Sequence, residues 1–358
     1  MNDRRPNILF LLTDDQRYDT IAALGNDQIH TPNFDYLVER GTAFTHAAIM
    51  GGTSDAVCMP SRAMLLTGRT LFHLEGRGES IPPDHTTMPE HFGDIGYQTF
   101  GTGKWHNGPD AYARSFSDGA EIFFGGMDDH WQVPACDFHL DGNYPAPRPH
   151  PVHWLPGERA MTDKRSDHVA EGVHSSELFA AATCDFLARS DRSRPFFAYV
   201  AFMAPHDPRT MPSEYLALYD PAQLDLPANF MPAHPFDNGA LDVRDEKLAR
   251  QPRDSDEIRQ HLADYYAMIT HLDAQIGQIL SLLRETNQLE DTIIVLAGDN
   301  GLALGQHGLM GKQNLYDHSV RVPLVIVGPG VPAGERRDAL CYLIDIFPTL
   351  CDLTGCPT

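Results

Sequence analysis

The chain is predicted to have an α/β fold, with a mostly parallel central sheet and helices on both faces of that sheet. Two observations support this prediction. Short, continuous apolar runs, typical of strands buried on both faces, alternate along the 358 residues with segments of helical periodicity. Several of these runs are followed directly by residue types suited to catalysis or metal binding, and open parallel sheets bind ligands at the carboxyl ends of their strands.

The first predicted strand, residues 7–12, leads into Asp14 and Asp15. Two adjacent carboxylates repel each other unless a cation or basic groups lie between them, and their oxygens suit calcium or magnesium. A turn with exposed aspartates is the alternative interpretation, and the strand context leaves both open. Further strands are predicted at residues 44–50, 97–101, 195–203, 292–296 and 323–327.

Three of these later strands also end in polar residues. Lys104 and His106 follow one of them. Because they are two residues apart, both side chains lie on the same side of an extended chain, where they could form a small anion site. His206 follows the next strand, and Asp299 with Asn300 follows another. We expect all of these residues to meet at one edge of the sheet.

Helical periodicity is clearest in residues 258–283, where apolar side chains recur every three or four positions. Asp254 with Glu257 resembles a capping box at the start of this helix. Residues 110–171 are rich in Gly, Pro, His and aromatic side chains, and are predicted to be a long irregular insertion. That insertion is either a wall of the substrate pocket or an ordinary surface loop. Further helices are predicted at residues 31–41, 60–68, 90–96, 175–190 and 344–353.

Residues 58–62 read Cys-Met-Pro-Ser-Arg and place Cys58 at the start of a helix. Pro60 suits the first turn, and the helix N-terminus favours an anion because free N–H groups and the positive end of the dipole gather there. If Cys58 stays a thiol, we expect this position to lower its pKa. The alternative interpretation is a small buried apolar residue, the common fate of a free cysteine.

The composition excludes several functions. A formal net charge of -22 argues against nucleic-acid binding, so an anionic substrate would have to be captured by a local basic cluster inside a pocket. Six cysteines without a Cys-x-x-Cys pair argue against a zinc site. No apolar run approaches the ~18 residues of a membrane span, so no membrane association is expected.

The N-terminal residues lead directly into the first strand, and we recognise no signal peptide. The expected location is the cytoplasm, or the periplasm or exterior if a leader has been removed.

The Cys-x-Pro-Ser-Arg motif at residues 58–62, followed by Leu-Thr-Gly-Arg at 66–69, resembles the signature of the type I sulfatases, which belong to the alkaline-phosphatase-like superfamily. The resemblance covers essentially the whole chain. It implies that a formylglycine-generating maturation enzyme oxidises Cys58 to formylglycine (3-oxoalanine), an aldehyde whose hydrate is the nucleophile. The implied reaction is hydrolysis of a sulfate ester, and residues 305–323 look most like those of carbohydrate-acting members.

The resemblance also implies roles for individual residues. Ca²⁺, with Mg²⁺ as the other candidate, would be held by Asp14, Asp15, Cys58, Asp299 and Asn300. Arg62 would hold the hydrated aldehyde, and His106 would contact the nucleophile. The sulfate would be contacted by two lysines, Lys104 and Lys312. His206 would serve the leaving group.

The substrate is expected to be a sulfated small molecule or saccharide, but the sugar, the ester position and the oligomeric state are not predicted. The chain is expected to be one catalytic domain, 1–358, in which the family's smaller C-terminal subdomain is absent or truncated. Candidate substrate contacts are His46, His73, His130, Trp131, Arg209 and His318.

Two alternatives remain open. A phosphonate, phosphate monoester or phosphodiester hydrolase of the same superfamily would use the same metal and nearly the same nucleophile. A non-catalytic homologue would keep the metal site with Cys58 unmodified.

Overall fold

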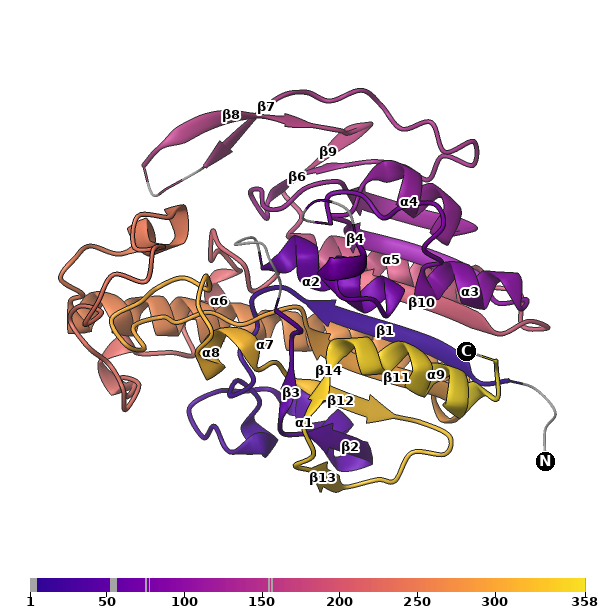
Figure 1. Ribbon diagram of the computed structural model, residues 1–358. Helices are drawn as coiled ribbons and strands as arrows, with labels where there is room; N and C mark the ends of the chain where they lie inside the picture. Colours follow the sequence, from indigo (N-terminus) through magenta and orange to yellow (C-terminus); the bar gives the residue numbers. More distant parts are fainter. Residues whose placement is uncertain are drawn as a thin grey trace.

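The computed structural model describes residues 5–51, 57–74, 76, 78–153, 155 and 157–357. The strands of its large sheet are β1 (Asn7–Thr13), β2 (Gly41–Phe44), β4 (Gln98–Lys104), β5 (Asp118–Phe123), β10 (Phe196–Ala201), β11 (Thr292–Gly298), β12 (Leu324–Val327) and β13 (Glu335–Arg337). Their spatial order is β13-β2-β12-β11-β1-β10-β4-β5 (Figure 1). The five strands from β11 to β5 run parallel, whereas β12 is antiparallel to both of its neighbours.

Helices cover both faces of this sheet. The α-helices among the described residues are α1 (Pro32–Arg40), α2 (Cys58–Thr67), α3 (Met88–Asp94), α4 (Pro109–Ser115), α5 (Ser175–Arg189), α6 (Ser213–Leu216), α7 (Ser255–Glu285), α8 (Asp317–Val320) and α9 (Ile346–Thr354). Within the described ranges, no helix combines the length and hydropathy needed to cross a bilayer.

The central strand shows why the sequence folds in this way. Alternate residues of β1 point to opposite faces, so Leu9 and Leu11 pack with α1, α5 and α7, while Phe10 and Leu12 pack with α2, α3, α4 and α9. Each fully buried leucine or phenylalanine contributes about 1.5–3 kcal/mol of transfer free energy. The predicted α/β fold class, with a mostly parallel sheet between two helical layers, is confirmed.

Two expectations about local structure differ from what is observed. Residues 44–50, predicted as one strand, contain the end of β2 and the two-residue strand β3 (Ala47–Ala48). Residues 110–171, predicted to be irregular, contain most of α4, strand β5 and two small antiparallel sheets. The strands of those sheets are β6 (Gln132–Ala135), β7 (Arg148–His153), β8 (Arg159–Lys164) and β9 (His168–Glu171).

Aromatic packing orders the first part of this insertion. The Tyr112 ring lies edge-on to the rings of Trp105, Phe124 and Tyr144. The remaining strand is β14 (Cys341–Tyr342), and the 3₁₀ helices are η1 (Ala22–Leu24), η2 (Leu71–His73), η3 (Pro221–Gln223), η4 (Arg244–Leu248), η5 (Leu289–Asp291) and η6 (Leu343–Asp345).

Candidate active site

The strand register brings the predicted site residues to one edge of the sheet. Thr13 pairs with Gly298, so Asp14 and Asp299 follow two neighbouring strands at the same level. Ala201 of β10 pairs with Leu12 of β1 and Gly103 of β4, which places the segments after β10 and β4 beside them. Because these strands are parallel neighbours, their carboxyl ends form a single rim.

Two lysines neutralise the carboxylates that follow β1. Lys104 Nζ forms an ion pair with Asp14 Oδ2. Lys312 Nζ lies 2.6 and 2.8 Å from the two carboxylate oxygens of Asp15. Burial alone would raise the pKa of Asp14, but Lys104, His206 and other cations hold it well below its ordinary value.

Asp15 has a left-handed backbone with φ of 62°, which is uncommon outside glycine. Two contacts hold it there. Its N–H donates to Asp299 Oδ1 (3.1 Å), and its carbonyl accepts the hydroxyl of Tyr265 on α7 (2.6 Å). Tyr265 also accepts the N–H of Arg17 (2.9 Å), so α7 fixes the loop after β1.

Cys58 is the first residue of α2 and reaches the same cluster. Its Sγ lies 3.3 Å from Asp14 Oδ1 and 3.2 Å from Lys312 Nζ. The expectation of a lowered thiol pKa is wrong: burial and the charge of Asp14 raise the pKa of Cys58 well above its ordinary value. The unmodified thiol is therefore a poor nucleophile in this environment.

Arg62 lies one helical turn after Cys58, and its guanidinium joins two strand ends. Its Nε donates to Asp299 Oδ2 (2.8 Å), and its Nη1 donates to the Lys104 carbonyl (2.9 Å). Arg62 is buried, and its Nη2 lies 3.6 Å from Asp14 Oδ2. Burial and the charge of Asp14 raise the pKa of Asp299 to about 6, although Arg62 opposes the shift.

The donor set fits a divalent cation. Asn300 donates through Nδ2 to Asp15 Oδ1 (2.6 Å) and the Gly301 carbonyl (3.0 Å), while its buried Oδ1 has no hydrogen-bond partner among the described residues. An amide oxygen with an unfilled lone pair beside carboxylates is a ligand that calcium and magnesium accept. One ligand atom each from Asp14, Asp15, Cys58 and His206 lies within 4.8 Å of the others.

Of the predicted metal residues, Asp14, Asp15 and Cys58 therefore belong to this group. Asp299 is not among these four residues, and its two oxygens accept hydrogen bonds from the Asp15 N–H and from Arg62 Nε.

His206 approaches the cluster from the segment after β10. Its Nε2 lies 3.6 Å from Asp15 Oδ2, and its Nδ1 lies 2.8 Å from the carbonyl oxygen of Asp207. Because a carbonyl only accepts, Nδ1 carries a hydrogen, and Nε2 is left to face the cluster.

His106 lies just past the end of β4. Burial and the charge of Lys104 lower its pKa well below the ordinary value, so the ring is neutral. Its buried Nδ1 has no hydrogen-bond partner among the described residues, and Gly126 packs against the other side of the ring. A neutral imidazole can accept a proton.

Sequence reasoning missed a group of charged residues in η4 that contacts the segments carrying His206 and Lys312. Arg244 binds both carboxylate oxygens of Asp207, next to His206, and also contacts Asp245 Oδ1 at 3.1 Å. Glu246 accepts the N–H groups of Met310 (2.9 Å) and Gly311 (2.8 Å), directly before Lys312.

The predicted substrate contacts lie in different places. His130 is buried behind His206, with Nε2 3.0 Å from the His206 carbonyl, so it supports that segment. Trp131 packs edge-on to His174, and His318 is buried beside Tyr316. Among the described residues, the hydrogen bonds of His46 and His73 do not connect either residue to the cluster. Arg209 alone of the six lines a cavity beside Asp207.

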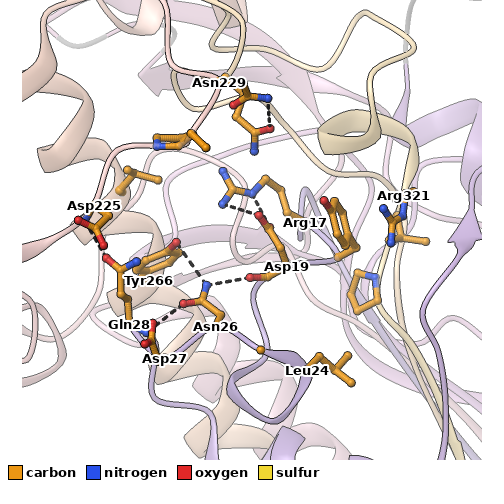
Figure 2. Close-up of a pocket in the computed structure, with 18 of the residues that line it drawn as sticks. Arg17, Asp19, Leu24, Asn26, Asp27, Gln28, Asp225, Asn229, Tyr266 and Arg321 are labelled. Carbon is orange, nitrogen blue, oxygen red and sulfur yellow. Dashed lines mark hydrogen bonds and ion pairs between the residues drawn. The ribbon is translucent and has the colours of Figure 1, made fainter. Parts of the chain in front are cut away.

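The largest cavity described is lined by none of the residues of this cluster. It encloses about 640 Å³ and contains the Arg17–Asp19 ion pair, with Asn26 bonded to the Asp19 carbonyl and to the Tyr266 hydroxyl (Figure 2). None of its described lining residues was predicted as a site residue. The chemistry of the side chains, and not cavity size, therefore locates the candidate active site.

Comparisons with known proteins agree with this geometry. The family model described as Sulfatase matches residues 6–356. The chain belongs to the sulfatase family. An arylsulfatase of Clostridium perfringens is 30% identical over 368 residues, covering 97% of this chain and 74% of that protein. An N-acetylglucosamine-6-O-sulfatase of Bacteroides thetaiotaomicron is 25% identical, covering 98% of this chain and 68% of that protein.

The fold also matches a phosphonate monoester hydrolase of Agrobacterium radiobacter, with a TM-score of 0.75 and 24% identity. The match covers 98% of this chain and 74% of that one, and it establishes the shared alkaline-phosphatase-like fold. This sulfatase is a sulfuric ester hydrolase, and its family implies a divalent metal and a formylglycine.

Proposed function

We propose that this sulfatase hydrolyses a sulfate ester on a saccharide, with Cys58 converted to formylglycine and Ca²⁺ held beside it by Asp14, Asp15, Asp299 and Asn300. The observation that carries the proposal is the contact of Cys58 Sγ with both Asp14 and Lys312 at the rim of the sheet. The saccharide is supported by the name of the Bacteroides relative. A maturation enzyme would perform the conversion of Cys58.

Charge balance supports a singly charged ester as substrate. The cluster holds as many carboxylates as cationic side chains, namely Asp14, Asp15 and Asp299 against Arg62, Lys104 and Lys312. When bound, a divalent cation supplies the excess positive charge that attracts a sulfate ester, and a formylglycine supplies an aldehyde hydrate as nucleophile.

The chain's own residues would then position the ester and move protons. Lys104 and Lys312 would bind the nonbridging sulfate oxygens from two sides, and Arg62 would hold position 58 against Asp299. As an imidazolium, which carries a hydrogen on both ring nitrogens, His206 would donate its Nε2 proton to the departing sugar oxygen. His106 would accept a proton from the nucleophile side. Each proton transfer is worth typically ~10²–10⁴ in rate.

The proposal is tested by comparing kcat/KM for N-acetylglucosamine 6-sulfate, an aryl sulfate and a phenylphosphonate monoester, using protein co-expressed with a formylglycine-generating enzyme. We expect the sulfate esters to be preferred, and the Cys58→Ala variant to be folded and inactive. Preference for the phosphonate would assign the chain to the rival reaction. Retained sulfatase activity in Cys58→Ala would reject the nucleophile.

A further inference from the structure

A cavity of about 310 Å³ lies beside the segment that carries His206. Its wall includes Asp207, Arg209, Thr210, Arg244, His261 and Asp264. Arg209 follows His206 by three residues, so the cavity adjoins the side of the site where the leaving alcohol would be protonated. This position makes the cavity a candidate for the part of the substrate beyond the ester.

Arg209 has no acidic partner within ion-pair distance among the described residues. Its Nη1 lies 3.3 Å from Nδ1 of His261, and its guanidinium stands 5.8 Å from the centre of the Tyr265 ring. Its Nε and Nη2, with the neighbouring Thr210 Oγ1, are buried and have no hydrogen-bond partner there. Buried polar atoms without partners are costly, so this group of donors favours a bound ligand.

The two nearby carboxylates are already engaged. Asp207 is bound by Arg244, and Asp264 accepts a hydrogen bond from Gln260 (2.8 Å). His261 is neutral, because burial and Arg209 lower its pKa to about 4, and a neutral Nδ1 accepts the Nη1 hydrogen and fixes the guanidinium orientation. Neither carboxylate therefore forms an ion pair with the Nε and Nη2 edge of Arg209.

The unpaired edge has the geometry that binds a two-oxygen anion. Nε and Nη2 lie on the same side of a guanidinium, and in this protein the corresponding edge of Arg17 binds Asp19 at 2.7 and 3.2 Å. We propose that Arg209 and Thr210 form a second anion site, which binds a carboxylate or a second sulfate on the alcohol part of the substrate. This inference rests on the proposed function and narrows its substrates to esters that carry two anionic groups.

The inference is tested by equilibrium binding to the Cys58→Ala variant, which needs no turnover. Two matched pairs separate the possible anions: glucosamine 2-N,6-O-disulfate against N-acetylglucosamine 6-sulfate, and iduronic acid 2-sulfate against its methyl ester. We expect the doubly anionic member of at least one pair to bind roughly 10- to 100-fold more tightly. The pair that discriminates identifies the second anion as sulfate or carboxylate.

Arg209→Gln, added to Cys58→Ala, should remove this preference, and Arg209→Lys should restore part of it. Arg40→Gln, at an exposed ion pair with Glu290, is the matched control and should change nothing. Equal affinities within both pairs, or a preference that survives in Arg209→Gln, would overturn the second anion site. Turnover of singly charged sulfate esters would still uphold the proposed function, so the two failures are distinguishable.

Discussion

Gly126 leaves room for the ring of His106, and this contact can be tested at the scale of one methyl group. A Cβ at position 126 would lie 3.0 Å from two ring atoms of His106, whereas a Cβ at Gly93 would meet Thr99 at an ordinary 3.5 Å. Gly126→Ala should therefore displace the ring by a few tenths of an ångström and lower kcat roughly 10-fold with a smaller change in KM.

Gly93→Ala, inside α3, is the control for this prediction and should keep full activity. If Gly126→Ala also kept the wild-type kcat, His106 would have no positional role in the reaction.

At the residue scale, the strand-end residues could be predicted because their signal is local. An apolar run followed by Asp14-Asp15 or Asp299-Asn300 places carboxylate and amide groups at a sheet edge without any knowledge of their partners. Arg244 and Glu246 could not be predicted. They lie in a polar segment without periodicity, and their partners Asp207 and Gly311 are 37 and 65 residues away.

At the scale of elements, η4 holds the loop that delivers Lys312, and Glu246→Gln tests this connection. Glu246 accepts two backbone N–H groups and pairs with buried Arg253. Glutamine has one acceptor oxygen, so one N–H would be left without a partner at a cost of about 1–3 kcal/mol. We expect a lower melting temperature and at least a severalfold rise in KM, because Lys312 would lose its fixed position.

The matched control for Glu246→Gln is Glu290→Gln at an exposed ion pair, which should leave both quantities unchanged. A normal KM in a destabilised Glu246→Gln protein would mean that η4 supports the fold alone.

The buried elements were predicted well and the insertion poorly, for physical reasons. Strands such as β1 and β11 are buried on both faces and read as uninterrupted apolar runs. Strand β7 contains Pro149 and Pro151, which argue against a strand, yet it pairs with β8 in a small sheet of its own. Tertiary pairing outweighs local preference there.

At the scale of the whole molecule, metal binding should stabilise the fold. The candidate ligands follow two strands that are far apart in the chain: Asp14 and Asp15 follow β1, and Asn300 follows β11. A cation bound among them requires the folded state and therefore favours it by mass action. At a hundred times its Kd, Ca²⁺ should add about 2.7 kcal/mol to the free energy of unfolding, and a chelator should remove this gain.

Asn300→Ala should reduce the Ca²⁺-dependent rise in melting temperature, while exposed Asn143→Ala should not. If neither Ca²⁺ nor a chelator changed the melting temperature, the proposed cation site would be contradicted.

Acid should destabilise the protein partly through His174. Its Nε2 bonds to the Thr210 carbonyl (2.8 Å), and its Nδ1 accepts the Ser176 N–H at the start of α5 (3.2 Å). Burial and the charges of His130 and His271 lower its pKa to about 2. Below pH 6.5, His174 therefore binds a proton in the unfolded chain but not in the folded chain. The free energy of unfolding then falls by about 1.4 kcal/mol for each pH unit of acidification.

Between pH 7 and pH 5 this single group should contribute a loss of about 2 kcal/mol, measured by urea unfolding. His174→Asn can still cap α5 but does not titrate, so it should lose correspondingly less stability over the same interval. Exposed His73→Asn is the control. Equal losses in wild type and His174→Asn would show that His174 does not govern the acid response.

The central claim is that residue 58 acts as formylglycine, and the mass of the peptide containing it tests this most directly. In protein that turns over sulfate esters, we predict that the peptide containing residue 58 is lighter than its cysteine form. The mass difference corresponds to the loss of one sulfur and two hydrogen atoms and the gain of one oxygen atom, which converts the thiol-bearing carbon to an aldehyde. The specific activity should rise in proportion to the modified fraction across preparations. Full activity in protein whose Cys58 peptide has entirely the cysteine mass would contradict the account.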